Sequence, residues 1–529
     1  MDIQTISTIE SASPIQSKKN SLMKFGVAFL FIIIVYIAVS FSHSDIANNN
    51  FLIIAAVFGA YMAMNIGAND VANNVGPAVG SNALSMMGAI VIAAIFEASG
   101  ALIAGGDVVS TIKKGIIDPA MIDNPDIFIW AMSAALLSAA LWLNFATYFG
   151  APVSTTHSIV GGVMGGGIAA AGFAIVAWGT IGKIAVSWVI SPVLGGLIAA
   201  LFLYLIKTQI VFKKDKIASA KKMVPILMAI MTIAFFTYIL LKGFKKIIKI
   251  DFPIALSIGM AVGITVYFLV KPLIANASKK LKNNRTSVNT LFNIPLIFSA
   301  ALLSFAHGAN DVANAIGPLA AINDAVISGG EFGGKVGIPL WVMAVGAVGI
   351  AIGLALYGPK LIKTVGSEIT QLDQMRAFSI ALAAAITVIL ASQLGLPVSS
   401  THIAVGGVFG VGFLREYIDN TEANLIKQTK QRFKDDQKEL EKFEKEFKKL
   451  DKKEDKSKKE YQKVIDLMGK IEELQELVKD DKKEFKQAKK IKYVKRDALK
   501  KIAAAWVITV PVAATLSASL FYMIKGFML

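Results

Sequence analysis

Long uninterrupted apolar runs dominate the sequence, and short polar segments separate them. A membrane-spanning helix needs about 20 mostly apolar residues. The runs that approach or reach this length are residues 24–41, 51–66, 84–104, 127–149, 158–176, 181–206, 222–241, 252–270, 290–306, 338–357, 375–395, 403–414 and 502–524. They are continuous rather than alternating, so they predict helices and not the strands of a transmembrane barrel. We interpret two of them as half-spans and expect an all-α integral membrane protein with about twelve crossings.

The first run predicts which side of the membrane holds the N-terminus. Lys18, Lys19 and Lys24 precede it, and basic residues flank membrane helices on the cytoplasmic side. Its apolar stretch of about 16 residues is longer than that of a usual signal peptide. We therefore expect a retained helix with a cytoplasmic N-terminus.

Residues 416–501 interrupt the apolar pattern and predict a charged helical hairpin inserted into the chain. Its apolar residues keep heptad spacing, which is typical of a coiled coil. They are Ile426, Phe433, Leu440, Phe443, Phe447 and Leu450 on the first arm, and Leu467, Ile471, Leu474, Val478, Phe485 and Ala488 on the second. Residues 451–457 contain no apolar side chain and suit the turn. The hairpin, expected in the cytoplasm, either decorates the protein or serves as a docking surface for a partner, a dimer contact or a regulatory lever.

Composition excludes a soluble protein. Residues 415–501 hold 28 of the 54 Lys and Arg and 21 of the 37 Asp and Glu. The rest of the chain keeps too few charges to be solvated in water, which excludes a soluble enzyme. We interpret the net charge of +17 as basic loops facing anionic cytoplasmic lipid rather than as nucleic-acid binding. The absence of cysteine excludes disulfides, thiolate metal sites and cysteine nucleophiles.

Two unusual peptides each occur twice, in the same order. Gly67–Pro77, Gly-Ala-Asn-Asp-Val-Ala-Asn-Asn-Val-Gly-Pro, returns as Gly308–Pro318 with nine of eleven positions identical. Pro152–His157, Pro-Val-Ser-Thr-Thr-His, returns as Pro397–His402 with one substitution. Ordered matches at nearly equal spacing indicate a duplicated unit. Duplicated membrane units commonly surround a substrate site that discontinuous helices build near the midplane.

The duplication divides the chain into six parts. They are residues 1–50, the polar N-terminus with an extra membrane helix; 51–206, the first repeat; 207–288, a basic linker with two membrane helices; 289–415, the second repeat; 416–501, the hairpin; and 502–529, the final membrane helix.

Each Asn-Asp motif has the composition of a cation site. Gly on one side and Gly-Pro on the other predict that the helix breaks there, which exposes carbonyl oxygens beside Asp70 and Asp311. Such oxygens suit a hard cation. An Asp inside a membrane is costly and by default functional. The alternative is that both carboxylates only cap broken helices.

The Pro-Val-Ser motifs predict the starts of two re-entrant half-helices. Ser and Thr are good N-cap residues, and free N–H groups at a helix start attract an anion. Hydroxyl donors added to these amides favour a tetrahedral oxyanion, while an ordinary N-cap inside a bundle is the alternative. We expect His157 and His402 to be structural hydrogen-bonding groups rather than titrating ones. Glu97 is an acid in an apolar run without a counterpart in the second repeat, and it is a candidate coupling residue.

Together the motifs resemble those of the inorganic phosphate transporter family, the Pit-type symporters. The resemblance implies an inverted-repeat α-helical carrier that imports phosphate with sodium or protons. It assigns cation binding to Asn69, Asp70, Asn73, Asn310, Asp311 and Asn314, with sodium at Asp70 and Asp311 if sodium is the coupling ion. It assigns phosphate binding to Ser154, Thr155, Thr156, Ser399, Ser400 and Thr401. Glu97 matches the acid that follows the first motif in family members, whereas the second glutamate of some members is missing from residues 379–382.

We therefore expect a secondary transporter, not an enzyme, that imports inorganic phosphate by cation symport with alternating access in the plasma or inner membrane. We expect no cofactor, and we expect Na⁺ or H⁺ to be transported together with phosphate. Expected partners are phosphate and membrane lipid, with no nucleic acid and with a homodimer left open. Two alternatives remain at this point: transport of sulfate or another oxyanion on the same fold, and a phosphate receptor that transports nothing.

Overall fold

The computed structural model describes residues 14–46, 49–151, 153–243, 248–328, 337–368, 372–418, 421–454, 457–488 and 496–528. Within these ranges the chain is helical, and a single isolated bridge between Ile117 and Val176 is the nearest approach to a sheet. The continuous apolar runs therefore gave the correct expectation of an all-α protein.

Eleven helical segments of the described chain are long and apolar enough to cross a membrane, against about twelve expected. They are α1 (Pro14–Ser42), α2 (Asn49–Asn69) with α3 (Ala72–Gly80), α4 (Met86–Ala104), α6 (Pro125–Tyr148), α8 (Trp178–Ile206), α9 (Lys216–Lys242), α10 (Phe252–Ala277), α11 (Arg285–Thr290) with α12 (Asn293–Ile327), α13 (Leu340–Glu368), α14 (Gln374–Gln393) and α18 (Arg496–Met528). Two further helices, α7 (Thr155–Ala171) and α15 (Ser400–Ile418), begin at buried residues inside the bundle.

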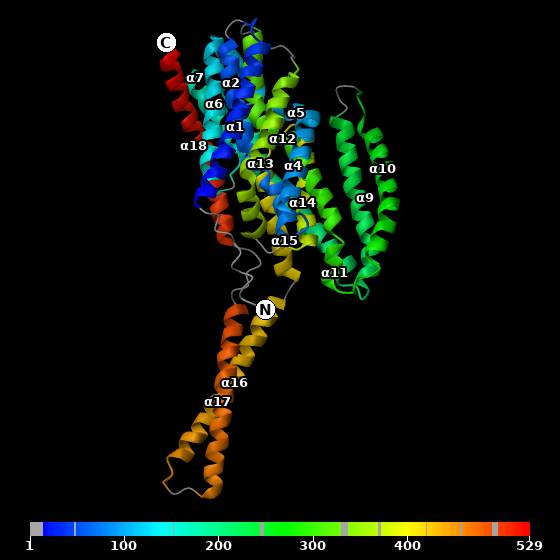
Figure 1. Cartoon of the computed structure of the whole chain (residues 1–529), viewed down its shortest axis with the longest axis vertical. Helices are drawn as coiled ribbons and strands as arrows, with labels where there is room; N and C mark the ends of the chain where they lie inside the picture. The colour runs from blue at the N-terminus through cyan, green and yellow to red at the C-terminus, as the bar shows by residue number, and fades with distance from the viewer. Residues whose placement is uncertain are drawn as a thin grey trace. The chain divides into compact units, whose positions relative to one another are not determined.

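The outer helices turn large apolar side chains away from the protein. Phe25 on α1 and Phe268 on α10 are 65% and 64% exposed, and α9 and α10 lie side by side at the edge of the helical bundle (Figure 1). Such a surface is unfavourable in water and suits contact with acyl chains. The helix lengths and this apolar exterior agree with a multi-pass membrane protein.

Helix α12 forms the centre of the membrane unit. It is buried on every side from Leu302 to Ile322, and it packs against α2, α4, α6, α13, α14 and the short helix α5 (Gly106–Lys114). Helix α2 is likewise buried without interruption from Met62 to Asn69. Helices buried all round belong to the core of a bundle. Both Asn-Asp motifs therefore lie deep in the membrane unit.

Glycines bring the two half-helices into close contact with their neighbours. A Cβ atom at Gly165 of α7 would lie 2.0 Å from the carbonyl oxygen of Ala514 on α18. A Cβ atom at Gly410 of α15 would lie 2.0 Å from the carbonyl oxygen of Gly196 on α8. Small residues allow membrane helices to approach backbone to backbone. The duplicated glycines thus hold α7 against α18 and α15 against α8.

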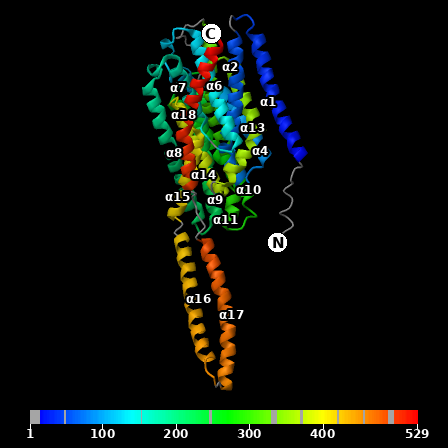
Figure 2. The same ribbon diagram turned by 90° about the vertical axis from the view of Figure 1, so that its left-hand side faces the viewer.

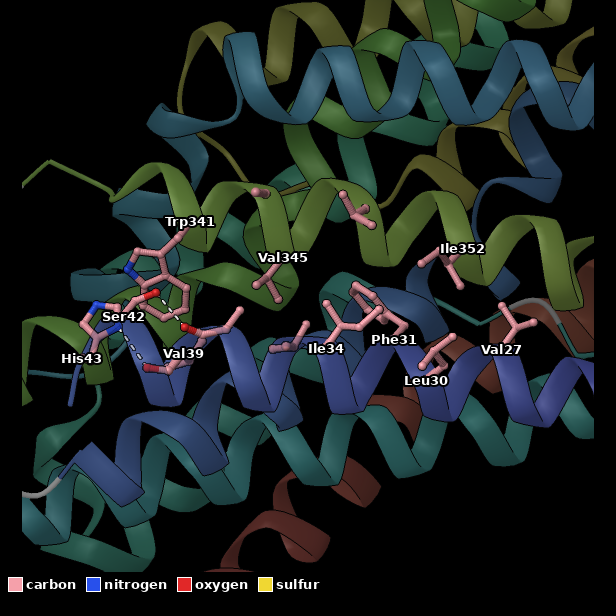
Figure 3. Close-up of a pocket in the computed structure, with 14 residues that line it drawn as sticks. Val27, Leu30, Phe31, Ile34, Val39, Ser42, His43, Trp341, Val345 and Ile352 are labelled. Atoms are coloured by element: carbon pink, nitrogen blue, oxygen red, sulfur yellow. Dashed lines mark hydrogen bonds between the residues drawn. The ribbon is translucent and has the colours of Figure 1, made fainter.

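Helix α1 leaves an apolar groove of about 480 Å³ where it packs against α13. Side chains of both helices line the groove, and His43 and Trp341 close one end with their rings 5.2 Å apart (Figure 3). The groove is lined almost entirely by apolar side chains.

The second compact unit comprises the described residues between 412 and 495, chiefly α16 (Thr421–Asp451) and α17 (Lys458–Ala488). The two helices run side by side (Figure 2), with Leu467 buried between them and Lys463 paired with Glu446 at 2.7 Å. The side chains of Ile426, Phe485 and Ala488 lie outside the described residues, and the supercoil expected from the heptads stays a prediction.

Helix α17 begins with a capping box. The backbone N–H of Ser457 donates to the Glu460 carboxylate at 2.8 Å, and the N–H of Glu460 reaches back to the Ser457 hydroxyl at 3.4 Å. Lys453 donates to the same carboxylate at 2.6 Å, and these bonds lower the pKa of Glu460 to about 2. This explains why the second helix of the hairpin starts at this charged stretch.

Replacing Gly165 by Ala should destabilise the membrane unit, because the new methyl group meets the backbone of α18. Overpacking of this kind costs about 1–3 kcal/mol, and we expect a lower thermal unfolding temperature of the purified protein in detergent. Gly182→Ala on α8 is the matched control, since a Cβ atom there meets nothing within 4 Å. Equal unfolding temperatures for Gly165→Ala and Gly182→Ala would contradict the close α7–α18 contact.

Candidate functional site

The first Asn-Asp motif interrupts its helix and the second does not. Helix α2 ends at Asn69 and α3 begins at Ala72, so Asp70 lies in the turn between them. Helix α12 continues through Asp311 without a break, and the expected interruption of the second motif is wrong. Pro77 and Pro318 lie inside α3 and α12. Because proline has no N–H, each frees the carbonyl group four residues earlier.

Those freed carbonyl groups belong to Asn73 and Asn314. Each motif therefore exposes one backbone oxygen beside its second asparagine, and the chain does not need a full helix break to do so. The glycine and proline pattern therefore predicted correctly that backbone oxygens are freed at both motifs. In α12 the cause is a missing hydrogen bond and not a break in the helix.

The Pro-Val-Ser motifs open α7 and α15 as expected. The Ser154 hydroxyl accepts the His157 N–H at 3.1 Å, and the Ser399 hydroxyl accepts the His402 N–H at 3.3 Å. Both serines are thus N-cap residues, and the next two residues of each motif present their hydroxyls to the interior. Pro152 lies outside the described residues.

The structure brings the carboxylates and the half-helix hydroxyls together. Asp70 accepts hydrogen bonds from Thr155 at 2.5 Å and from Thr401 at 2.8 Å. Asp311 accepts one from Ser400 at 3.0 Å. Thr155 and Thr401 belong to different repeats, so Asp70 bridges the starts of both half-helices. None of these side chains is more than 2% exposed.

The second asparagine of each motif also crosses to the other repeat. Asn73 donates to Thr401 at 2.9 Å, and Asn314 donates to Thr155 and Thr156 at 3.1 Å each. Thr156 in turn donates to the carbonyl oxygen of Val398 at 2.9 Å, just before the second half-helix. The two half-helix starts therefore face one shared site.

The first asparagine of each motif points elsewhere. Asn69 donates to the carbonyl oxygen of Ala151 and accepts from the N–H of Val153, both at 3.2 Å. Asn310 donates to the carbonyl oxygen of Leu396 at 3.2 Å. These amides hold the turn that precedes the half-helix of their own repeat. Of the six motif residues assigned to cations, Asn69 uses both its donor and its acceptor in this backbone contact, whereas Asn310 uses only its NH2 group.

A buried histidine connects Glu97 to the site. The Nδ1 atom of His307 lies 2.7 Å from Glu97 Oε2, and its Nε2 atom lies 2.9 Å from Asp311 Oδ2. Asn74 donates to the other oxygen of Glu97 at 2.6 Å. Glu97 therefore acts on the site through His307 and does not itself contact the hydroxyl cluster among the bonds described.

The site combines two buried carboxyl groups with acceptors that lack donors. One ligand atom each of Asp70, His307 and Asp311 lie within 4.8 Å of one another. The Oδ1 atoms of Asn73, Asn310, Asn314 and Asp311 are buried and have no hydrogen-bond partner in the described chain. A buried acceptor without a donor is costly, and a cation relieves this cost. The donor set fits a hard cation bound to oxygen.

His157 and His402 pack against tryptophans beside the site. The His157 ring lies 3.7 Å from Trp188, and the His402 ring lies 3.5 Å from Trp506, measured between ring centres. The Nδ1 atom of His157 lies 3.3 Å from the carbonyl oxygen of Trp506. Each histidine thus packs at the start of a half-helix, which fits the structural role expected for both.

The sequence model of the phosphate transporter family matches residues 66–517, a range that includes every residue of the site. The chain belongs to the phosphate transporter family. Its relatives are permeases and not enzymes, so the resemblance drawn from the two motifs is confirmed, as is the expectation that the protein is a transporter.

Individual relatives agree with the family assignment. A candidate phosphate permease of Helicobacter pylori (strain J99) is 50% identical over 532 residues, which cover 98% of both chains. A candidate phosphate permease of Pyrococcus abyssi is 40% identical over 364 residues, which cover 69% of this chain and 89% of the relative. A solved structure described as the sodium-dependent phosphate transporter matches with a TM-score of 0.72 and 32% identity, covering 90% of this chain and 99% of that one.

Two residues of this phosphate transporter site escaped the sequence analysis. His307 immediately precedes the second Gly-Ala-Asn-Asp, and Asn74 lies inside the first motif. Their counterparts in the other repeat are Ile66 and Ala315. A polar residue that replaces an apolar one between repeats is the signal that would have found both. With Glu97 they form one cluster, built from both repeats, in which no member has a polar counterpart in the other repeat.

The contact between Glu97 and His307 predicts strongly coupled effects on stability. Glu97→Ala and His307→Ala should each destabilise the protein, because each leaves a buried polar partner behind. The double variant should cost less than the sum of the two, by about 0.5–3 kcal/mol. Unfolding in detergent of the four proteins measures this difference, and strictly additive losses would show that the two side chains do not interact.

Proposed function

We propose that this transporter imports inorganic phosphate together with sodium ions by alternating access. The observation that carries the proposal is the shared site in which donor-free oxygens of Asn73, Asn314 and Asp311 lie beside two half-helix starts. Oxygen acceptors suit the cation and amide and hydroxyl donors suit the anion, so one site serves both. The likeness to a transporter described as sodium-dependent favours sodium over protons.

The hydrogen bonds of the site supply a physical basis for coupling. Thr155 and Thr401 donate to Asp70, and Ser400 donates to Asp311. These hydroxyls cannot donate to phosphate while they donate to a carboxylate. A cation bound to Asp70 and Asp311 takes over the carboxylate oxygens and frees the hydroxyls to turn toward the anion. Sodium binding therefore prepares the phosphate site.

Charge explains why cations accompany the anion. Moving one charge against a membrane potential of 100 mV costs about 2.3 kcal/mol. The entry of a phosphate dianion into a negative interior therefore costs about 4.6 kcal/mol. Two monovalent cations cancel that cost. The carboxylates of Asp70 and Asp311 each supply a seat, and Glu97 adds a third negative group behind His307.

We assign phosphate binding to Thr155, Thr156, Ser400 and Thr401 with the free amides of their half-helices, while Ser154 and Ser399 cap the helix starts.

The repeats at residues 51–206 and 289–415 are inverted relative to each other. The protein lies in the plasma or inner membrane, with the hairpin in the cytoplasm. The hairpin at 416–501 either decorates the transporter or serves as a docking surface for a cytoplasmic partner, a contact between two copies of the chain or a regulatory lever.

Reconstitution into liposomes tests the function. We expect labelled phosphate to accumulate under an inward sodium gradient, to accumulate less under a pH gradient alone, and to be displaced only weakly by excess sulfate. Strong competition by sulfate would favour a general oxyanion carrier on the same fold. Binding of phosphate without accumulation under either gradient would instead favour a receptor.

Asp70→Asn and Asp311→Asn should each lose most sodium-stimulated uptake, because each keeps its shape but removes one negative charge that holds a cation. Asp215→Asn is the matched control: Asp215 caps α9 by accepting the N–H of Ala218 at 2.9 Å, outside the site, and asparagine caps a helix equally well. Phosphate uptake measured against sodium concentration distinguishes a cation-binding role from a helix-capping role of these carboxylates. Wild-type sodium dependence in both site variants would mean that these carboxylates only cap helices.

Thr156→Val and Ser400→Ala should raise the apparent KM for phosphate roughly ten- to hundredfold each, since each removes one hydroxyl donor to an anion. Ser299→Ala serves as the control, because the Ser299 hydroxyl is buried and donates within α12 to Leu296 at 2.9 Å. Uptake at saturating sodium gives the KM values. An unchanged KM in both variants would move the phosphate site away from the half-helices.

A further inference from the structure

Two turns lead into the half-helices, and glycine shapes both. Gly150 lies between α6 and α7, and Gly395 lies between α14 and α15. Their φ angles are +71° and +64°, values that favour glycine. The two glycines occupy matching places two residues before the prolines of the repeated motif. We call them the first turn (residues 149–153, of which 152 is not described) and the second turn (residues 394–398).

Each turn is held on its inner side by the site. Asn69 bonds to Ala151 in the first turn, and Asn310 bonds to Leu396 in the second. These asparagines directly precede Asp70 and Asp311. A ligand bound at either carboxylate therefore contacts a residue that is adjacent in sequence to the asparagine that positions a turn.

The second turn, and the residue just before the first turn, also receive hydrogen bonds from the opposite repeat. The Thr111 hydroxyl on α5, in the first repeat, donates to the carbonyl oxygen of Gly395 at 2.7 Å. The Lys360 ammonium on α13, in the second repeat, donates to the carbonyl oxygen of Tyr148 at 2.8 Å, next to the first turn. Both contacts cross the boundary between repeats. The second turn also accepts hydrogen bonds from Trp188 at Pro397, 3.2 Å, and from Thr156 at Val398, 2.9 Å, so the first repeat holds it at three points.

The helix that carries Thr111 is itself anchored. Lys113 pairs with Asp324 of α12, and Asp107 pairs with Lys242 of α9. These ion pairs bracket Thr111 on α5 and fix its distance from the second turn. The contact with Gly395 is therefore made by a rigid element.

The two contacts lie at different depths in the bundle. Met343, in the first turn of α13, comes close to Gly105 at the start of α5. Lys360 lies about 25 Å further along α13 at 1.5 Å per residue. That distance approaches the thickness of about 30 Å of a hydrocarbon core. The start of α5, the helix that carries Thr111, is thus well separated from Lys360 along α13.

We infer that Thr111 and Lys360 are positioning residues that hold the second and first turns shut over the site. Release of one contact opens the site toward one side of the membrane, while the other stays closed. The inference rests on the proposed transport function and extends it to residues outside the repeated motifs. It accounts for the burial of Asp70 and Asp311, each no more than 1% exposed, in a structure in which both contacts are made.

Single introduced cysteines test the inference directly, because the natural chain contains none. Ala151→Cys reports on the first turn and Leu396→Cys on the second, and both positions are half-buried. Each reporter is combined with Thr111→Val or with Lys360→Met in the full-length protein in liposomes. A membrane-impermeant thiol reagent is applied from each side in turn, and the rate of modification is measured.

We expect Thr111→Val to raise the rate at Leu396→Cys about fivefold, the shift that loss of one hydrogen bond brings, and to leave Ala151→Cys unchanged. Lys360→Met should do the reverse, from the opposite side of the membrane. Thr111→Ser keeps the hydroxyl and should restore the wild-type rate. Equal acceleration of both reporters by either variant would indicate general loosening and overturn the inference, as would no acceleration at all.

Phosphate uptake separates this inference from the proposed function. Thr111→Val should lower the maximal uptake rate more than it changes the KM for phosphate, because it alters the turn and not the binding groups. If the wild-type protein moves no phosphate, the proposed function fails, yet the reporter rates still show whether the two contacts hold the turns. Selective reporter rates with unaltered maximal uptake would mean that the contacts position the turns without serving transport.

Discussion

The burial of two carboxylates within a membrane bundle is the constraint on which the rest of the site depends. Asp70 and Asp311 are almost fully excluded from solvent, and an uncompensated charge in such surroundings is expensive. Hydroxyls of both half-helices, an asparagine network and one histidine surround them. These groups are donors, and the same donors suit an anion once a cation has taken the carboxylates. The groups that offset the cost of burial are therefore the same groups to which the proposed function assigns the anion.

Most residues of the site occur in both repeats, and a few polar residues occur in one repeat only. The two half-helices, the two Asn-Asp motifs and the two glycine turns recur in both repeats and meet in pairs. Asn74, Glu97 and His307 each occur in one repeat without a counterpart in the other, and Asn74 and His307 both contact Glu97. A transporter with two identical halves would bind its ions symmetrically. His307 contacts Asp311, and Ile66 stands at the matching place before Asp70. The two carboxylates therefore have different surroundings.

Much of the fold followed from local sequence pattern, because the membrane imposes a simple rule. Backbone polar groups must be paired within a spanning segment, so a continuous apolar run forms a helix. The same reasoning located the half-helix starts at Ser154 and Ser399, where a capping residue follows a proline. It was wrong about α12 at Asp311, where packing on every side keeps the helix continuous and proline frees a single carbonyl group instead.

By itself, the sequence determined the helical class, the duplication, the family and the set of polar residues that had to be buried together. Only the tertiary structure decided how those residues divide their work. It turned Asn69 and Asn310 toward the glycine turns, set Thr401 and Thr155 on the same carboxylate, and brought His307 between Glu97 and Asp311. The physical reason is that hydrogen bonds between residues far apart in the chain depend on how helices pack, which local periodicity does not encode.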